Sequence, residues 1–315
     1  MSLPKFAWFR RQIVPYGEAK VGVLTHTLNY GTGIFAGLRG YWNGAEKQLF
    51  VFRPADHFRR FLQSAKLLSM DFGLSEDDLF HSLLALLRAE DYQQDCYIRP
   101  FGYFADETIS SSQPGELRAE VSMVAIPFKG LTSRENGLHV TVSSWRRIDD
   151  TMIPARGKIA GGYVNTFLAR TDALRAGFDD VLLLNNDGHV SEGSLTNFFL
   201  IRNGVACTPP ITDNILEGIT RNSLITLLRQ ELGIPVEERP IDRSEIYVGD
   251  EAFLCGTATQ LAPITRIDYR ALGTGKVGPI TGALSELQDR LVHGYDEKYL
   301  HWCAPVYQPA EADAG

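Results

Sequence analysis

Residues 151–171, TMIPARGKIAGGYVNTFLART, have the pattern of a loop that runs into a helix. Lys158 lies in the loop next to Gly157, with Gly161 and Gly162 close behind. Lysine is scarce here, with eight lysines against twenty-three arginines. Glycines have no Cβ, so they let a backbone approach a flat ligand closely. The stretch therefore indicates a lysine that meets such a ligand, against the simpler alternative of a solvated loop lysine.

A lysine of this kind suits covalent chemistry. When its pKa is lowered, the amine can condense with an aldehyde and form a Schiff base. A ligand that carries a phosphate would need a second site, and LEGITRNSLITLLRQELG (216–233) offers one. Gly218, Ile219 and Thr220 begin a helix there, where free N–H groups and the helix dipole favour an anion. The alternative is an ordinary N-cap threonine.

Three further segments carry candidate residues. The turn GTATQ (256–260) offers small residues and hydroxyl groups, or is a plain strand-end turn. In HFRRF (57–61), one of two mid-helix arginines could grip an anion with two hydrogen bonds, although a solvated arginine is the alternative. Glu192, in HVSEGSLTNFF, could pair with a protonated ring nitrogen or be a hairpin-end acid in water.

Composition limits the classes of function. The chain has 315 residues, 44% of them hydrophobic, which is enough for two domains. A net charge of −7 gives no sign of nucleic-acid binding. We find no apolar run of membrane-spanning length and no secretory leader, and the four cysteines are too widely spaced to indicate a zinc or disulfide framework. These features predict a soluble cytoplasmic protein without a metal site.

Apolar periodicity predicts an α+β chain of two domains. We expect an N-terminal α+β domain over 1–130, an interdomain loop over 131–137, and a strand-rich cofactor-binding domain over 138–315. The expected elements of the first domain are strands at 47–53, 96–104 and 119–128 and helices at 54–70 and 75–91, the second helix starting with a capping box at Ser75. The second domain should contain strands at 138–145 and two hairpins with turns near Asp187 and Asn203.

In this order, the segments resemble the class IV pyridoxal-phosphate-dependent aminotransferases, most closely the branched-chain amino-acid transaminases. The resemblance runs from about Phe9 to Trp302 and rests on HTLNYGTGIFAGLR (26–39), HFRRF, CYIRP (96–100), IPARGKIAGGYVN, SEGSLTNFF, LEGITR and FLCGTATQLAPI. It implies a small N-terminal α/β sandwich and a larger strand-rich pseudo-barrel, with pyridoxal 5′-phosphate between them. It also implies a homodimer or higher homo-oligomer, in which the interface helps to build each site.

The resemblance also assigns roles to residues. Lys158 would form the Schiff base and carry the proton, Tyr163 would bond the ring hydroxyl, and Glu192 would hold the pyridine nitrogen protonated. The implied phosphate contacts are Arg60, Gly218, Ile219, Thr220 and Thr257. The implied substrate contacts are Tyr30, Phe35, Tyr97, Arg99, Phe128 and Ala258. The expected reaction moves an amino group from a branched-chain L-amino acid (leucine, isoleucine or valine) to 2-oxoglutarate by a ping-pong mechanism, as in branched-chain amino-acid biosynthesis.

The chain departs from the family pattern at Ala36, where an acid is usual, at Phe128–Gly137, and at Leu195–Thr196. The first two departures fall near the expected side-chain pocket, so the donor substrate, its stereochemistry and a biosynthetic or degradative role stay open. D-amino-acid transaminase, (R)-amine transaminase and aminodeoxychorismate lyase are alternatives within the family. A non-catalytic phosphate-binding module or an inactive scaffold is the alternative outside it.

Overall fold

The computed structural model describes residues 3–109, 114–130 and 136–307. It has two compact units, Met1–Lys129 with Asp289–Gly315, and Gly130–Gln288. We expected the second domain to run to residue 315, whereas the segment from Asp289 belongs to the first unit because strand β17 (Cys303–Pro305) pairs with β5 (Gln48–Phe52). Residues 131–135 of the expected interdomain loop, and the end of the chain after 307, lie outside the described residues.

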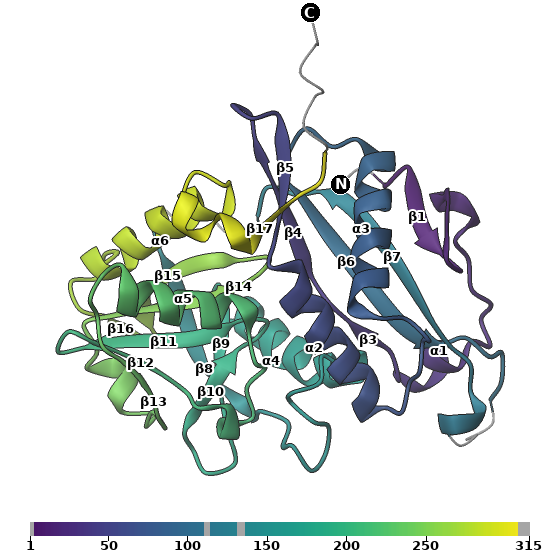
Figure 1. The fold of residues 1–315 in the computed structure, drawn as a ribbon. Coiled ribbons are helices and arrows are strands. Elements are labelled where there is room, and N and C mark those ends of the chain that lie inside the picture. The colour runs from purple at the N-terminus through teal and green to yellow at the C-terminus, as the bar shows by residue number, and fades with distance from the viewer. Residues whose placement is uncertain (1–2, 110–113, 131–135, 308–315) are drawn as a thin grey trace, which may run out of the picture. The chain divides into compact units, whose positions relative to one another are not determined.

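The first unit is built on an antiparallel sheet of eight strands among the described residues (Figure 1). Its strand order is β17-β5-β4-β6-β7-β1-β2, and β3 pairs with β6. The other strands are β1 (Phe6–Phe9), β2 (Gln12–Pro15), β3 (Ile34–Phe35), β4 (Leu38–Asn43), β6 (Cys96–Phe104) and β7 (Ala119–Pro127). Strands β6 and β7 pair along their whole length, so this sheet fixes Tyr97 and Arg99 on one face.

Three helices accompany this sheet: α1 (His26–Tyr30), α2 (Pro54–Leu67) and α3 (Glu76–Glu90). Helices α2 and α3 pack on each other and on the sheet (Figure 1). Phe58, Phe61 and Ala65 form the buried face of α2, at the spacing that the sequence predicted. The capping box of α3 is confirmed, since Ser75 and Asp78 bond each other's backbone N–H groups.

The second unit is built on a sheet of nine strands among the described residues, ordered β10-β9-β8-β15-β14-β11-β12-β13, with β16 beside β15. The strands are β8 (Leu138–Arg146), β9 (Asp180–Leu184), β10 (Val190–Gly193), β11 (Asn197–Arg202), β12 (Val205–Thr208), β13 (Val236–Glu238), β14 (Glu251–Gly256), β15 (Gln260–Ile267) and β16 (Arg270–Ala271). Their apolar residues form one buried core that includes Phe198, Leu200 and Leu254.

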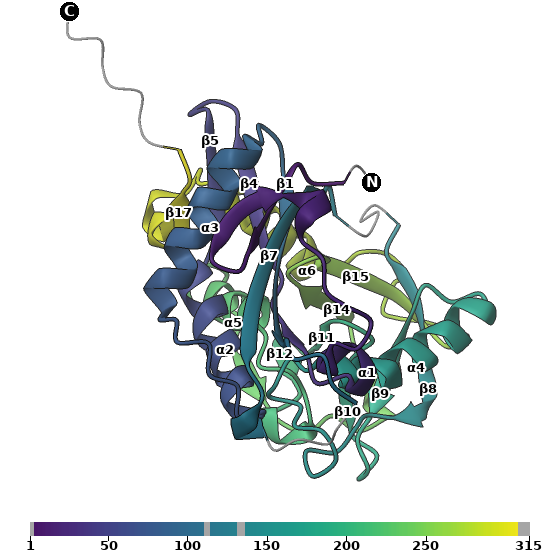
Figure 2. The ribbon, with the colours of Figure 1, turned by 90° about the vertical axis from the view of Figure 1, so that its right-hand side faces the viewer.

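Helix α4 (Tyr163–Arg175) packs on β8 and β9 through Ala169 and Ala173 (Figure 2). Helix α5 (Ile219–Gln230) packs on β14 and β13, and α6 (Pro279–Val292) ends in the first unit. The 3-10 helices are η1 (Tyr16–Glu18), η2 (Pro114–Glu116), η3 (Ala160–Gly162), η4 (Ile211–Asp213), η5 (Glu245–Tyr247) and η6 (Glu297–Trp302). Over the described ranges, every helix is too short or too polar to cross a lipid bilayer.

Candidate active site

Lys158 lies in the loop before η3, half-buried between buried Gly157 and Ile159. Its Nζ donates a hydrogen bond to the hydroxyl of Tyr163, the first residue of α4, at 2.7 Å. The same nitrogen is 5.2 Å from the centre of the Tyr163 ring. The structure therefore brings together the candidate amine and the candidate phenol, because η3 turns the chain back between them.

Glu192 lies on β10 and is almost fully buried. One carboxylate oxygen lies 3.0 Å from a guanidinium nitrogen of Arg147. The other accepts hydrogen bonds from the Asn197 side chain and from the backbone N–H of Leu216, both at 3.1 Å. Burial raises the pKa of Glu192, while Arg147, the Leu216 N–H group and the charge of Lys158 oppose that rise. Lys158 is thus close enough to act on this carboxylate.

The start of helix α5 lies next to the same carboxylate. Gly218 is the N-cap, and no side-chain hydrogen bond caps the helix. A Cβ at Gly218 would overlap the side-chain oxygen of Asn197, so glycine is needed for this close approach. Thr220 is buried in the first turn. An uncapped helix start beside small residues is the arrangement that binds a phosphate through backbone N–H groups.

Thr257 and Ala258 form the tight turn between β14 and β15. Strand β14 pairs with β11, so the turn lies at the same end of the sheet as Asn197. A Cβ at Gly256 would lie 3.5 Å from the backbone oxygen of Leu195. Within the described part of the chain, the buried hydroxyl of neighbouring Thr196 has no hydrogen-bond partner. An orphaned buried hydroxyl beside this turn fits a polar ligand.

The first unit holds a second group of candidate residues. The Arg99 guanidinium lies 4.6 Å from the Phe35 ring centre and donates a hydrogen bond to the Tyr97 hydroxyl at 3.0 Å. The rings of Tyr97 and Phe128 are 5.5 Å apart. The structure therefore joins four predicted substrate contacts into one cluster, which we call the Arg99 cluster. It combines a cation and a hydroxyl with aromatic surface.

Two predicted residues are not part of these groups. Tyr30 is exposed on α1, its ring lies against His26, and its hydroxyl donates to the backbone oxygen of Ile109. Arg60 is buried on α2, in the first unit, and its backbone oxygen accepts a hydrogen bond from Ser64. The roles of both residues stay predictions.

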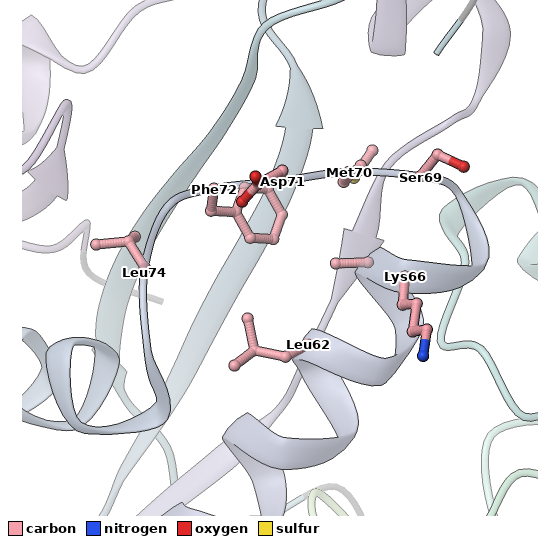
Figure 3. A pocket seen from close by; sticks show the side chains of 8 residues that line it. Leu62, Lys66, Ser69, Met70, Asp71, Phe72 and Leu74 are labelled. Atoms are coloured by element: carbon pink, nitrogen blue, oxygen red, sulfur yellow. The ribbon is translucent and has the colours of Figure 1, made fainter. Parts of the chain in front are cut away.

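A hollow at the end of α2 contains none of the candidate residues. It has a volume of about 390 Å³ and opens widely to solvent. Figure 3 shows its side chains, among them Leu62, Lys66 and Phe72. Lys66 is the one basic side chain that lines it, so the hollow offers little for anion binding.

Sequence reasoning missed Arg147 and Asn197 as members of the site. Arg147 lies two residues after the expected strand at 138–145 and reads as a polar residue after a strand. Asn197 lies within the motif SEGSLTNFF, where the sequence assigns it no role. Both act on Glu192, and neither has a sequence signal of its own beyond its place beside a motif.

A model of the family "Amino-transferase class IV" matches residues 33–267. The chain belongs to the class IV aminotransferases. A probable branched-chain-amino-acid aminotransferase of Aquifex aeolicus is 44% identical over 302 residues, which cover 96% of this chain and 97% of that protein. The branched-chain-amino-acid aminotransferase of Escherichia coli K12 is 33% identical over 96% of this chain and 98% of its own length.

Solved structures agree with this class IV assignment. The branched-chain aminotransferase of Thermoproteus uzoniensis with norvaline has a TM-score of 0.92 and 43% identity, covering 96% of this chain and 100% of that one. The enzyme of Thermobaculum terrenum in its PLP-form has a TM-score of 0.92 and 38% identity, covering 98% and 100%. These matches confirm the predicted mixed α and β fold of class IV aminotransferases and the prediction that this chain is an enzyme.

Proposed function

We propose that this aminotransferase transfers the amino group of branched-chain L-amino acids to 2-oxoglutarate, with pyridoxal 5′-phosphate bound covalently through Lys158. The observation that carries the proposal is the half-buried Lys158 amine, bonded to Tyr163 and within electrostatic reach of a buried carboxylate, Glu192. Relatives named as branched-chain aminotransferases, and one neighbour in its PLP-form, support the substrate class and the cofactor.

The residues present fit this cofactor. Lys158 would hold its aldehyde carbon, Tyr163 its ring hydroxyl, and Glu192 its ring nitrogen. The uncapped start of α5 at Gly218, Ile219 and Thr220 would hold its phosphate, with Thr257 and Arg60 as further contacts. When bound, the cofactor supplies the electron sink that stabilises negative charge at the substrate α-carbon.

The side chains of this chain supply the proton transfers. When it is not bonded to the cofactor, the Lys158 amine would take the proton from the substrate α-carbon and return it two bonds further along, beyond the substrate nitrogen. Tyr163 holds the Lys158 amine in place between the removal and the return of the proton, because its hydroxyl accepts a hydrogen bond from that amine. In its ionised form, the Glu192 carboxylate would favour a protonated ring nitrogen, which would strengthen the electron sink.

The Arg99 cluster supports a pocket that accepts two kinds of substrate. Phe35 and Phe128 offer apolar surface for leucine, isoleucine or valine. Arg99 and the Tyr97 hydroxyl offer hydrogen bonds to a carboxylate, as 2-oxoglutarate requires. With an apolar substrate, the Arg99 charge would stay against the rings of Phe35 and Tyr97, which lowers the cost of leaving it without a carboxylate.

We also propose a homodimer or a higher homo-oligomer. Helix α4 exposes Val164, Phe167, Leu168 and Leu174, and Trp145 is exposed beside it with its ring N–H bonded to Asp172 of α4. We call this surface the α4 apolar face. An apolar helix face open to water usually meets a partner. A cytoplasmic location stays a prediction from the sequence.

A half-reaction screen tests the proposed substrate class. The purified enzyme with bound cofactor is mixed with L-leucine, L-glutamate, D-alanine or (R)-1-phenylethylamine, and loss of the visible absorption band is followed by stopped flow. We expect fast loss with L-leucine and L-glutamate, and loss slower by at least about 100-fold with the other two, because their stereochemistry or missing carboxylate misplaces the α-carbon. Fast loss only with D-alanine or with the amine would contradict the proposal.

A further inference from the structure

Arg147 links Glu192 to the segment that leads into helix α5. One guanidinium nitrogen lies 3.0 Å from the Glu192 carboxylate, and Nε donates to the backbone oxygen of Asn214 at 3.1 Å. Both charged side chains are largely buried, with 11% of Arg147 and 8% of Glu192 exposed. A buried carboxylate that loses its cation partner tends to take up a proton.

The segment that Arg147 holds is fastened at other points as well. Asn197 donates to the backbone oxygen of Leu216 at 2.9 Å, and Ser191 donates to that of Asp213 at 2.6 Å. The Leu216 N–H group in turn bonds Glu192. The carboxylate and the start of α5 are therefore parts of one hydrogen-bond network. Arg147 is the member of this network that carries a positive charge.

We propose that Arg147 is a positioning residue that keeps Glu192 ionised and holds its carboxylate in a fixed position relative to the N-terminus of α5. The inference rests on the proposed function, since it concerns the two ends at which a bound pyridoxal phosphate would be held. Arg147 acts through Glu192 and through the backbone oxygen of Asn214. Among the described residues, Lys158 also acts on Glu192, and Cys255 responds to its charge; Lys158 would be engaged by the cofactor.

The test uses holoenzyme loaded with pyridoxal 5′-phosphate that carries ¹⁵N in its ring, and compares wild type with Arg147→Met by NMR. We expect the wild-type ring nitrogen to be protonated at pH 7.5. In the variant its signal should move to the neutral position, and kcat with L-leucine should fall about tenfold or more with KM changed by less than about threefold. A protonated nitrogen in the folded variant would overturn the proposal.

Arg147→Lys provides a second measurement if the methionine variant does not fold. Lysine keeps the positive charge, but it lacks the planar guanidinium that contacts Glu192 and the Asn214 backbone oxygen at the same time. We expect a protonated ring nitrogen at pH 7.5 that loses its proton at a pH lower by about half a unit or more, with the cofactor released at least about threefold faster. Wild-type values for both quantities would overturn the proposal.

Arg202→Gln is the matched control. Like Arg147, Arg202 lies in the second unit and forms an ion pair, with Glu245 at 3.1 Å, but its side chain is 42% exposed. It should leave the ring nitrogen and the release rate unchanged. If the wild-type protein binds no cofactor at Lys158, the proposed function fails instead, so the two failures are distinguishable.

Discussion

At the scale of single residues, Lys158 and Arg99 make different kinds of contact. Lys158 donates a hydrogen bond to the Tyr163 hydroxyl. Arg99 lies against the rings of Phe35 and Tyr97 and donates to a hydroxyl. A lysine can change its protonation state, whereas an arginine stays charged, so the first suits proton transfer and the second suits recognition of a carboxylate.

Gly37 tests the recognition role. A Cβ at this position would overlap the Tyr97 hydroxyl, which accepts the hydrogen bond of Arg99. We expect Gly37→Ala to shift Tyr97 and to lower kcat/KM for 2-oxoglutarate about tenfold, with an effect on L-leucine below about threefold. Steady-state kinetics with each substrate measures this. Gly44→Ala is the control, since its Cβ would be in ordinary contact with Trp42 alone. An equal loss with both substrates would contradict the recognition role.

The sequence identified residues that stand within motifs and missed those that act from outside them. Lys158 and Glu192 could be found because glycines and a hairpin frame them. Arg147 could not, because its role depends on contacts with Glu192 and Asn214, which are distant along the chain. Such a pairing is a property of the folded chain and leaves no local pattern.

At the scale of elements, periodicity predicted the long helices and strands well. Helix α2 was expected over 54–70 and spans Pro54–Leu67, and β6 was expected over 96–104 and spans Cys96–Phe104. The short strand β17 was not predicted. Three residues are too few to show alternation, and pairing with β5 joins distant parts of the chain. This is why the extent of the second unit differs from the expected domain.

His293 helps to fasten this C-terminal segment to the first sheet. Its ring lies 3.6 Å from Asp95, which also pairs with buried Arg39, and its backbone oxygen accepts from Asn43. Burial lowers the pKa of His293, but its hydrogen bonds to Asp95 and the Asp289 backbone outweigh this and raise the pKa. The pKa of Asp95 is lowered, since His293, the Trp42 N–H and Arg39 outweigh burial.

The directions of these two pKa shifts determine how the stability contributed by the contact changes with pH. Because the pKa of His293 is raised in the folded protein, its contact with Asp95 stabilises the fold fully below the unfolded value of about 6.5, and this stability is lost as pH rises through the folded value. Because the pKa of Asp95 is lowered, its carboxylate stays charged down to acid pH. We expect His293→Gln to lower the melting temperature by about 1–3 °C more at pH 5.5 than at pH 9. His81→Gln, an exposed histidine with a similar backbone contact, should show no such difference. A loss independent of pH would contradict this account.

At the scale of the whole molecule, the α4 apolar face is a feature that a single chain leaves unexplained. Phe167, its most exposed member, is 69% exposed. We expect Phe167→Asp to convert the proposed dimer to monomers, because a charge at a buried interface position is left without a partner. Light scattering on a size-exclusion column measures the mass. Val248→Asp, also at an exposed apolar residue, should leave it unchanged. An unaltered mass for Phe167→Asp would exclude this face as the interface.

The proposed chemistry depends on the Lys158 Nζ atom, so the decisive measurement identifies the residue to which the cofactor is attached. The holoenzyme is reduced with borohydride, digested, and its peptides are analysed by mass spectrometry. We expect one phosphopyridoxyl adduct, on Lys158, and none when Lys158→Ala is treated in the same way. An adduct on another lysine, or none on the wild-type protein, would contradict this expectation.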